Sequence, residues 1–240
     1  PIKPTNIGSA ITTRPWSAVQ PFYLAFYPFM IGIGYLLTLN ISFSCWAFYL
    51  LVKLENVFAV AAGFREPGAS LAMARAPYTA EQGAGAFIGL AVLLLWTGRS
   101  TLRDAWHAAV QGKPAGDEML SYRTAFLGLF VGFAFLVGFC WRAGMSPVIA
   151  AAYLLIVLVF TMTIARIVAE AGAGWAWGPS MNARQMIVAA TSIGAMPPQQ
   201  VTAWSYFLFP DMDYRDTPMP QQLQGARIGT AAGIRSRTML

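Results

Sequence analysis

The residues best suited to chemistry are ionisable side chains at the edges of apolar segments. Arg166 and Glu170 are four positions apart at the end of a strongly apolar run, so a helix would place them on one face, where they can pair. Glu81 stands beside a shorter apolar run. Charged groups at membrane depth are costly and usually face protein or water. They therefore predict either a solute or ion pathway, in which Glu81 and Glu170 exchange protons, or ion pairs that anchor helix ends.

Polar residues at alternate positions interrupt the longest apolar run: Thr38, Asn40, Ser42 and Ser44. Side chains with this spacing cannot all lie on one helix face. We therefore expect the helix axis to break between Thr38 and Ser44, with the unwound backbone contacting a solute. Ordinary hydrogen bonding between helices is the alternative interpretation.

The remaining charged residues predict no catalytic or metal chemistry. Lys53 and Glu55 are two positions apart and should point to different helix faces. His107, the single histidine, has no second histidine or paired cysteine near it, so the spacing of a metal site is absent. The chain also lacks a nucleophile elbow, a phosphate-binding loop and a zinc-protease motif. We expect no enzyme activity, no metal and no cofactor.

The apolar run itself defines the class of protein. Residues 21–52 contain no charged side chain, and the chain is 57% hydrophobic and 11% charged. A continuous helix of that run would be about 48 Å long, against about 30 Å for the hydrocarbon core. The sequence therefore predicts an all-α, polytopic transmembrane helical bundle with a broken first helix.

Three regions follow from the distribution of apolar residues: a polar, extended connector at 1–20, a transmembrane region at 21–210 and a polar tail at 211–240. The expected spans are 41–62, 80–98, 120–141 and 147–169. Residues 100–111 have the spacing of an amphipathic helix on the membrane surface. Residues 183–196 and 201–209 are each too short to span, which predicts a re-entrant or hairpin-like carboxy-terminal region.

Location and partners follow from composition. The net charge of +6 is spread over connecting segments, which favours a positive-inside bias over nucleic-acid binding. This bias places residues 99–123 and everything after residue 166 on the cytoplasmic side of a bacterial membrane, with the turn at Arg142 outside. The chain begins without Met, and we expect a fragment whose partners are the lipid bilayer and either the remainder of a longer chain or other membrane subunits.

Three separated blocks carry a family resemblance: IGIGYLLTLNISFSCWAFYLL, RIVAEAGAGWAWGP and WSYFLFPDMDYRDTPMPQQLQGARI. They resemble a family of uncharacterised bacterial polytopic membrane proteins, which in turn is distantly similar to the oligopeptide transporters and yellow-stripe-like metal-chelate transporters. That resemblance implies proton-coupled transport of peptides or metal chelates. The competing hypothesis is a non-transporting structural subunit or scaffold within a larger membrane assembly.

Overall fold

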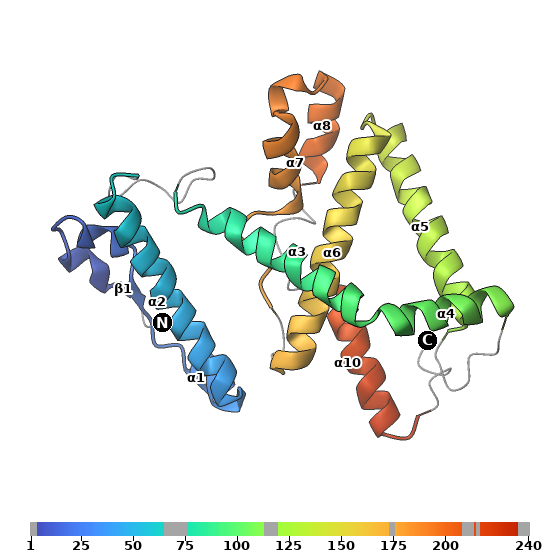
Figure 1. The fold of residues 1–240 in the computed structure, drawn as a ribbon, viewed down its shortest axis with the longest axis horizontal. Coiled ribbons are helices and arrows are strands. Elements are labelled where there is room, and N and C mark those ends of the chain that lie inside the picture. Colours follow the sequence, from blue (N-terminus) through green and yellow to red (C-terminus); the bar gives the residue numbers. More distant parts are fainter. Residues whose placement is uncertain are drawn as a thin grey trace. The chain divides into compact units, whose positions relative to one another are not determined.

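The computed structural model describes residues 4–64, 76–112, 120–172, 176–207, 214 and 217–234. In this part of the chain the structure is helical apart from one short two-stranded ribbon (Figure 1). The chain divides into two compact units. Unit 1 comprises residues 1–83 and 170–174, and unit 2 comprises residues 84–169 and 175–240.

The amino-terminal segment of unit 1 is folded. Strand β1 (Thr5–Asn6) pairs antiparallel with β2 (Tyr23–Leu24), and the short 3-10 helices η1 (Ile7–Ala10) and η2 (Trp16–Val19) lie between them. The Asn6 Oδ1 atom accepts hydrogen bonds from the backbone N–H groups of Gly8 and Phe22, both at 3.1 Å. The expectation of an extended connector is therefore wrong, because one asparagine side chain joins the two ends of the segment.

The first apolar run is broken, as the sequence predicts. Helix α1 (Pro28–Leu36) begins at a proline suited to the first helical turn, and α2 (Leu39–Ala61) follows after two residues. The break is formed by Leu37 and Thr38, whose ψ angles of 150° and 148° are extended. The unwinding predicted up to Ser44 is wrong beyond Thr38. The Ser44 hydroxyl donates to the Asn40 carbonyl at 2.8 Å, so it is satisfied inside a continuous helix.

Four helices are long and apolar enough to cross a membrane in the described part of the chain: α2, α3 (Thr79–Thr97), α5 (Tyr122–Arg142) and α6 (Pro147–Ala171). Their ends agree with the four predicted spans to within about two residues, as expected for boundaries drawn from hydropathy alone. Helix α4 (Arg99–Gln111) is the predicted amphipathic helix, and it ends at Gly112 with a left-handed φ of 65°.

Helix α6 forms the core of unit 2. Its buried side chains include Ala150, Tyr153, Phe160 and Ile164. The Thr163 hydroxyl, fully buried, donates to the carbonyl of Phe87 on α3 at 3.0 Å. At the far end of unit 2, Trp106 of α4 packs edge-on against Phe126 of α5 with ring centroids 5.2 Å apart. Helix α6 thus contacts α3 through a buried hydrogen bond, while α4 packs at the amino-terminal end of α5.

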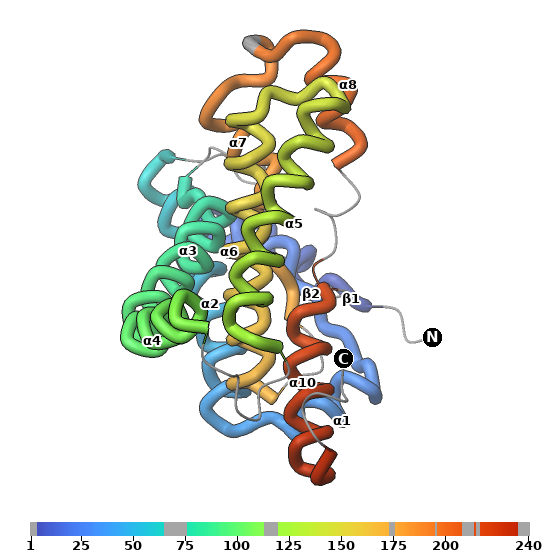
Figure 2. The backbone as a smooth tube through the Cα atoms, turned by 90° about the vertical axis from the view of Figure 1, so that its right-hand side faces the viewer, coloured from blue at the N-terminus to red at the C-terminus, as the bar shows by residue number. Residues whose placement is uncertain are grey.

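The carboxy-terminal region of unit 2 contains the predicted hairpin. Helices α7 (Ala183–Thr191) and α8 (Pro198–Tyr206) are joined through the 3-10 helix η3 (Ile193–Ala195), at the end of unit 2 that also holds the turn between α5 and α6 (Figures 1 and 2). The tail beyond it includes a further helix, α10 (Pro218–Ala231), that the sequence analysis did not assign.

The tip of this hairpin lies beside the turn between α5 and α6. The Gln200 Oε1 atom accepts from the backbone N–H of Ser146 at 3.4 Å, and a Cβ on Gly144 would lie 3.7 Å from the Cβ of Gln199. This turn is at the opposite end of α5 from α4. The hairpin tip and α4 thus lie at opposite ends of α5, while the cytoplasmic location expected for the residues after 166 stays a prediction.

Candidate functional site

Two connecting segments of unit 2 meet beside the middle of α6. Phe160 is one residue past the midpoint of α6 (Pro147–Ala171), and its ring centroid lies 6.1 Å from that of Tyr214. Gly178, in the non-helical stretch before α7, packs so closely on Tyr214 that a Cβ would come within 2.2 Å of its ring. The chain thus enters and leaves the α7–α8 hairpin beside the middle of a helix that is long and apolar enough to span the membrane.

Local sequence fixes where the two hairpin helices begin. The Asn182 Oδ1 atom accepts from the backbone N–H of Gln185, and the Gln185 Oε1 atom accepts from the backbone N–H of Asn182, both at 2.9 Å. This reciprocal cap satisfies backbone donors that would otherwise be exposed at the start of α7. Pro198 occupies the first turn of α8, where a missing N–H costs nothing.

Two buried N–H donors face inward from α8. Gln200 and Trp204 are four residues apart, with 4% and 1% of their surfaces exposed. Their Nε2 and Nε1 atoms have no hydrogen-bond partner among the described residues. The ring of Tyr153 on α6 lies edge-on to Trp204, with centroids 5.5 Å apart. A buried donor without an acceptor costs about 1–3 kcal/mol. This cluster is therefore suited to hold a water molecule or an oxygen of a bound solute.

A cavity of about 570 Å³ lies on another face of α8. Phe139 of α5 and Ala143, which follows α5, form one wall, and Thr202, Ala203 and Tyr206 of α8 belong to the other. Most of this surface is apolar, and its polar side chains are those of Gln199, Thr202 and Tyr206. Its volume is within the usual range for small-molecule sites.

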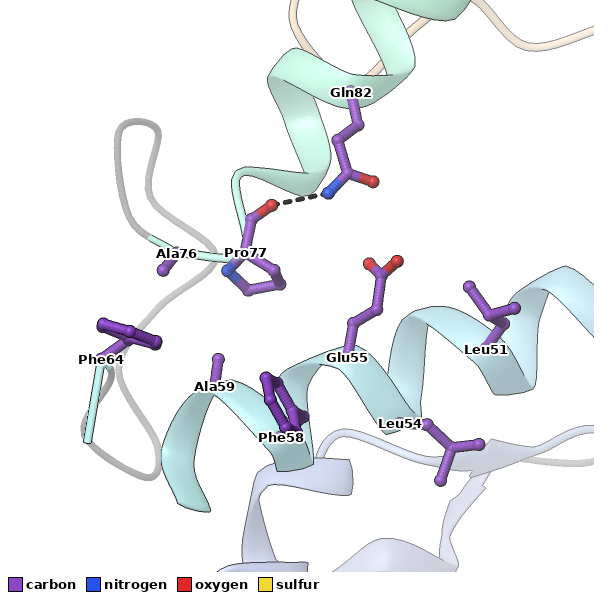
Figure 3. A pocket seen from close by; sticks show the side chains of 9 residues that line it. All are labelled: Leu51, Leu54, Glu55, Phe58, Ala59, Phe64, Ala76, Pro77 and Gln82. Atoms are coloured by element: carbon purple, nitrogen blue, oxygen red, sulfur yellow. Dashed lines mark hydrogen bonds between the residues drawn. The ribbon is translucent and has the colours of Figure 1, made fainter. Parts of the chain in front are cut away.

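Unit 1 contains a second cavity, of about 490 Å³, between α2 and the first turn of α3 (Figure 3). The Glu55 side chain points from α2 toward Pro77 and Gln82. The Gln82 Nε2 atom donates to the Pro77 carbonyl at 2.7 Å. The Glu55 Oε2 atom is buried and has no hydrogen-bond partner among the described residues. Among the described residues that line this cavity, Glu55 is the one with a charged side chain.

The residues that the sequence analysis singled out line none of the cavities described here: Thr38, Asn40, Ser42, Ser44, Glu81, Arg166 and Glu170. Five of them are exposed, and Ser42 and Glu81 are half-buried. Glu81 lies in the first turn of α3, where a negative charge is favourable. The structure does not gather the polar residues of α2 around a cavity, and the role of all seven stays a prediction.

The sequence analysis missed three residues that the structure places at candidate sites: Glu55, Gln200 and Trp204. The sequence predicted only that Glu55 and Lys53 point to different faces of a helix, with no chemical role for either. Gln200 and Trp204 are four apart in a short segment after two prolines. That spacing indicates a shared helix face, and it was the one available signal for the cluster.

Comparisons with known proteins agree with part of the resemblance. No curated protein and no solved structure matches the chain. The comparisons therefore give no support to the distant likeness to oligopeptide transporters. One family model matches residues 1–240, so that the chain belongs to DUF6785, a family of unknown function.

Proposed function

We propose that this chain forms part of a secondary transporter for a small solute such as a peptide or a metal chelate. The observation that carries the proposal is the α7–α8 hairpin of two short helices, whose flanking segments meet beside Phe160 at the middle of α6. Irregular backbone at membrane depth is tolerated where it is buried in protein or lines a wet cavity. Discontinuous helices near the midplane are a common way to build solute sites in transporters.

The buried donors of α8 define which solutes the hairpin would suit. The Gln200 and Trp204 N–H groups are complementary to acceptor oxygens. Peptides and most metal chelates present carboxylate oxygens, and a neutral donor pair can bind these without placing a fixed charge in the hairpin. The Tyr153 ring would form an apolar wall beside such a group.

The ionisable residues predicted from the sequence have a place in this proposal. Glu81 and Glu170 would handle protons, with Arg166 as the charge that Glu170 senses one helical turn away. Thr38, Asn40, Ser42 and Ser44 would line the pathway where α1 ends and α2 begins.

Uptake by membrane vesicles tests the proposal. Vesicles from bacteria that express the protein should accumulate radiolabelled dialanine or iron(III) citrate in a saturable, proton-dependent manner. The Gln200→Leu variant should lose this uptake, while Gln224→Leu, at an exposed glutamine of α10, should retain it. Absence of saturable uptake of both probes, with correctly assembled protein in the vesicles, would count against transport.

The alternative function is a structural subunit, and the surface of α2 favours it. Phe43 and Trp46 are 55% and 53% exposed, and their rings form an edge-on pair with centroids 5.0 Å apart. Such a pair is suited to pack against lipid or a neighbouring membrane protein. A scaffold should co-purify in fixed stoichiometry with one partner after mild solubilisation, and Phe43→Ala combined with Trp46→Ala should release that partner.

A further inference from the structure

We propose that the cavity beside Glu55 is a binding site for a small organic ammonium ion. The inference concerns binding in unit 1 alone, and it holds whether the protein transports solutes or acts as a scaffold.

The position of the Glu55 carboxylate favours a bound cation. Glu55 is six residues before the end of α2 (Leu39–Ala61), about 9 Å along the axis from the end of a helix that can span the membrane. Its Oε2 atom is buried without a hydrogen-bond partner among the described residues. Glu55 is half-buried, and a carboxylate oxygen that is buried without a positive partner or donor is unfavourable. A cation in the adjacent cavity would remove that cost.

The distribution of charge around the cavity also favours a cation as the ligand. Glu55 is the one charged residue among the described residues that line it. Lys53 does not serve as its partner, because its Nζ atom donates to the Pro21 carbonyl at 2.5 Å in a different part of unit 1. Arg65, Glu66 and Arg75 lie outside the described residues. Across the cavity, Gln82 uses its Nε2 atom on Pro77, and its Oε1 atom is an acceptor rather than a donor.

The size of the cavity and the composition of its walls favour an organic cation over a bare metal ion. A volume of about 490 Å³ suits a small organic molecule better than a bare metal ion. Calcium needs six to eight oxygen ligands, whereas Glu55 and Gln82 supply the side-chain oxygens of this cavity among the described residues. The Phe58 and Phe64 rings line the same cavity, both on one side of Glu55 (Figure 3), and aromatic faces attract organic cations.

Ligand-dependent unfolding of the purified protein tests this site. Trimethylammonium should raise the midpoint of thermal unfolding in a saturable manner, and tert-butanol, a neutral molecule of similar shape, should not. Glu55→Gln should raise the half-saturating concentration by about tenfold or more, since the charge partner is lost. Asp104→Asn removes an exposed carboxylate from α4 and should leave the response unchanged.

A measurement on the unmodified protein covers the case in which Glu55→Gln does not fold. Trimethylammonium should slow the labelling of Glu55 by dicyclohexylcarbodiimide several-fold, as followed by mass spectrometry, and tert-butanol should not. Equal responses to the two probes, an undiminished response in Glu55→Gln, or no response in either experiment would overturn the proposal. The last result is the one expected if a cation of the chain itself already pairs with Glu55.

Discussion

Lys53 and Glu55 are two residues apart on α2 and face different cavities of unit 1. Lys53 lines an apolar cavity of about 360 Å³ beneath the amino-terminal segment, where its Nζ atom lies 5.3 Å from the centre of the Tyr49 ring. Glu55 lines the cavity next to the start of α3. Residues two apart on a helix point to different faces, so the two charges do not face each other. The pair can therefore be tested one residue at a time.

Lys53→Met should loosen the amino-terminal segment and leave the Glu55 cavity intact. The substitution removes the hydrogen bond to the Pro21 carbonyl but keeps an apolar stem of similar length. Since Lys53 is half-buried, we expect a loss of about 1 kcal/mol. Hydrogen exchange of residues 4–24 should accelerate about fivefold. Lys53→Arg keeps a donor, so its hydrogen exchange should match that of the native protein. Equal acceleration in both variants would contradict a stabilising role for the hydrogen bond from Lys53 to the Pro21 carbonyl.

Gly178→Ala should disrupt the entry to the hairpin. An added Cβ would come within 2.2 Å of the Tyr214 ring, which is itself buried. Overpacking of this kind costs about 1–3 kcal/mol or more, and the thermal unfolding midpoint should fall. Gly194→Ala is the matched control, because a Cβ there has no neighbour within 4 Å. Adding Tyr214→Leu should partly restore the unfolding midpoint that Gly178→Ala lowers. An unchanged midpoint in Gly178→Ala, with no further effect of Tyr214→Leu, would exclude a close approach of the two residues.

The hairpin tip should be accessible from the side of the membrane opposite to α4. In a background without Cys45 and Cys140, cysteines at Gly194 and at Ala143 should be labelled by an impermeant maleimide from one side, and a cysteine at Asp104 from the other. The reason is that Phe126, which contacts α4, and Arg142 at the other end of α5 are about 24 Å apart along the helix. Labelling of Gly194 and Asp104 from the same side would contradict the placement of the hairpin tip at the turn between α5 and α6.

Thr163→Val should weaken the packing of α3 on α6. The Thr163 hydroxyl is the donor to the Phe87 carbonyl of α3, and valine keeps its shape. A loss of about 0.5–1.5 kcal/mol is expected. Thr161 is two residues away, and its hydroxyl donates within α6 to the Val157 carbonyl at 2.8 Å. Thr161→Val should therefore change stability less in chemical unfolding of the detergent-solubilised protein, and an equal loss would remove the reason for the inter-helix assignment.

Hydropathy predicted the four long helices because apolar length is a local property of the sequence. The axis break at Leu37 and Thr38 was predicted slightly too far along the chain, since hydroxyl groups such as that of Ser44 can bond inside a helix as well as interrupt one. The folded amino-terminal segment depends on Asn6 reaching Phe22, sixteen residues away. The cavity of Glu55 and Gln82 likewise joins residues that are 27 positions apart in the sequence, and no periodicity reports such contacts.

The short hairpin helices have a consequence for the thickness of the barrier that they form. Helices α7 and α8 have nine residues each, so each is about 13.5 Å long, whereas α6 with 25 residues is about 37 Å long. Where this hairpin takes the place of a full span, one side of the membrane is separated from its middle by less than half of the hydrocarbon thickness. A given displacement of the hairpin tip is therefore a larger fraction of the length of α7 or α8. That fraction is almost three times the fraction that the same displacement would be of the length of α6.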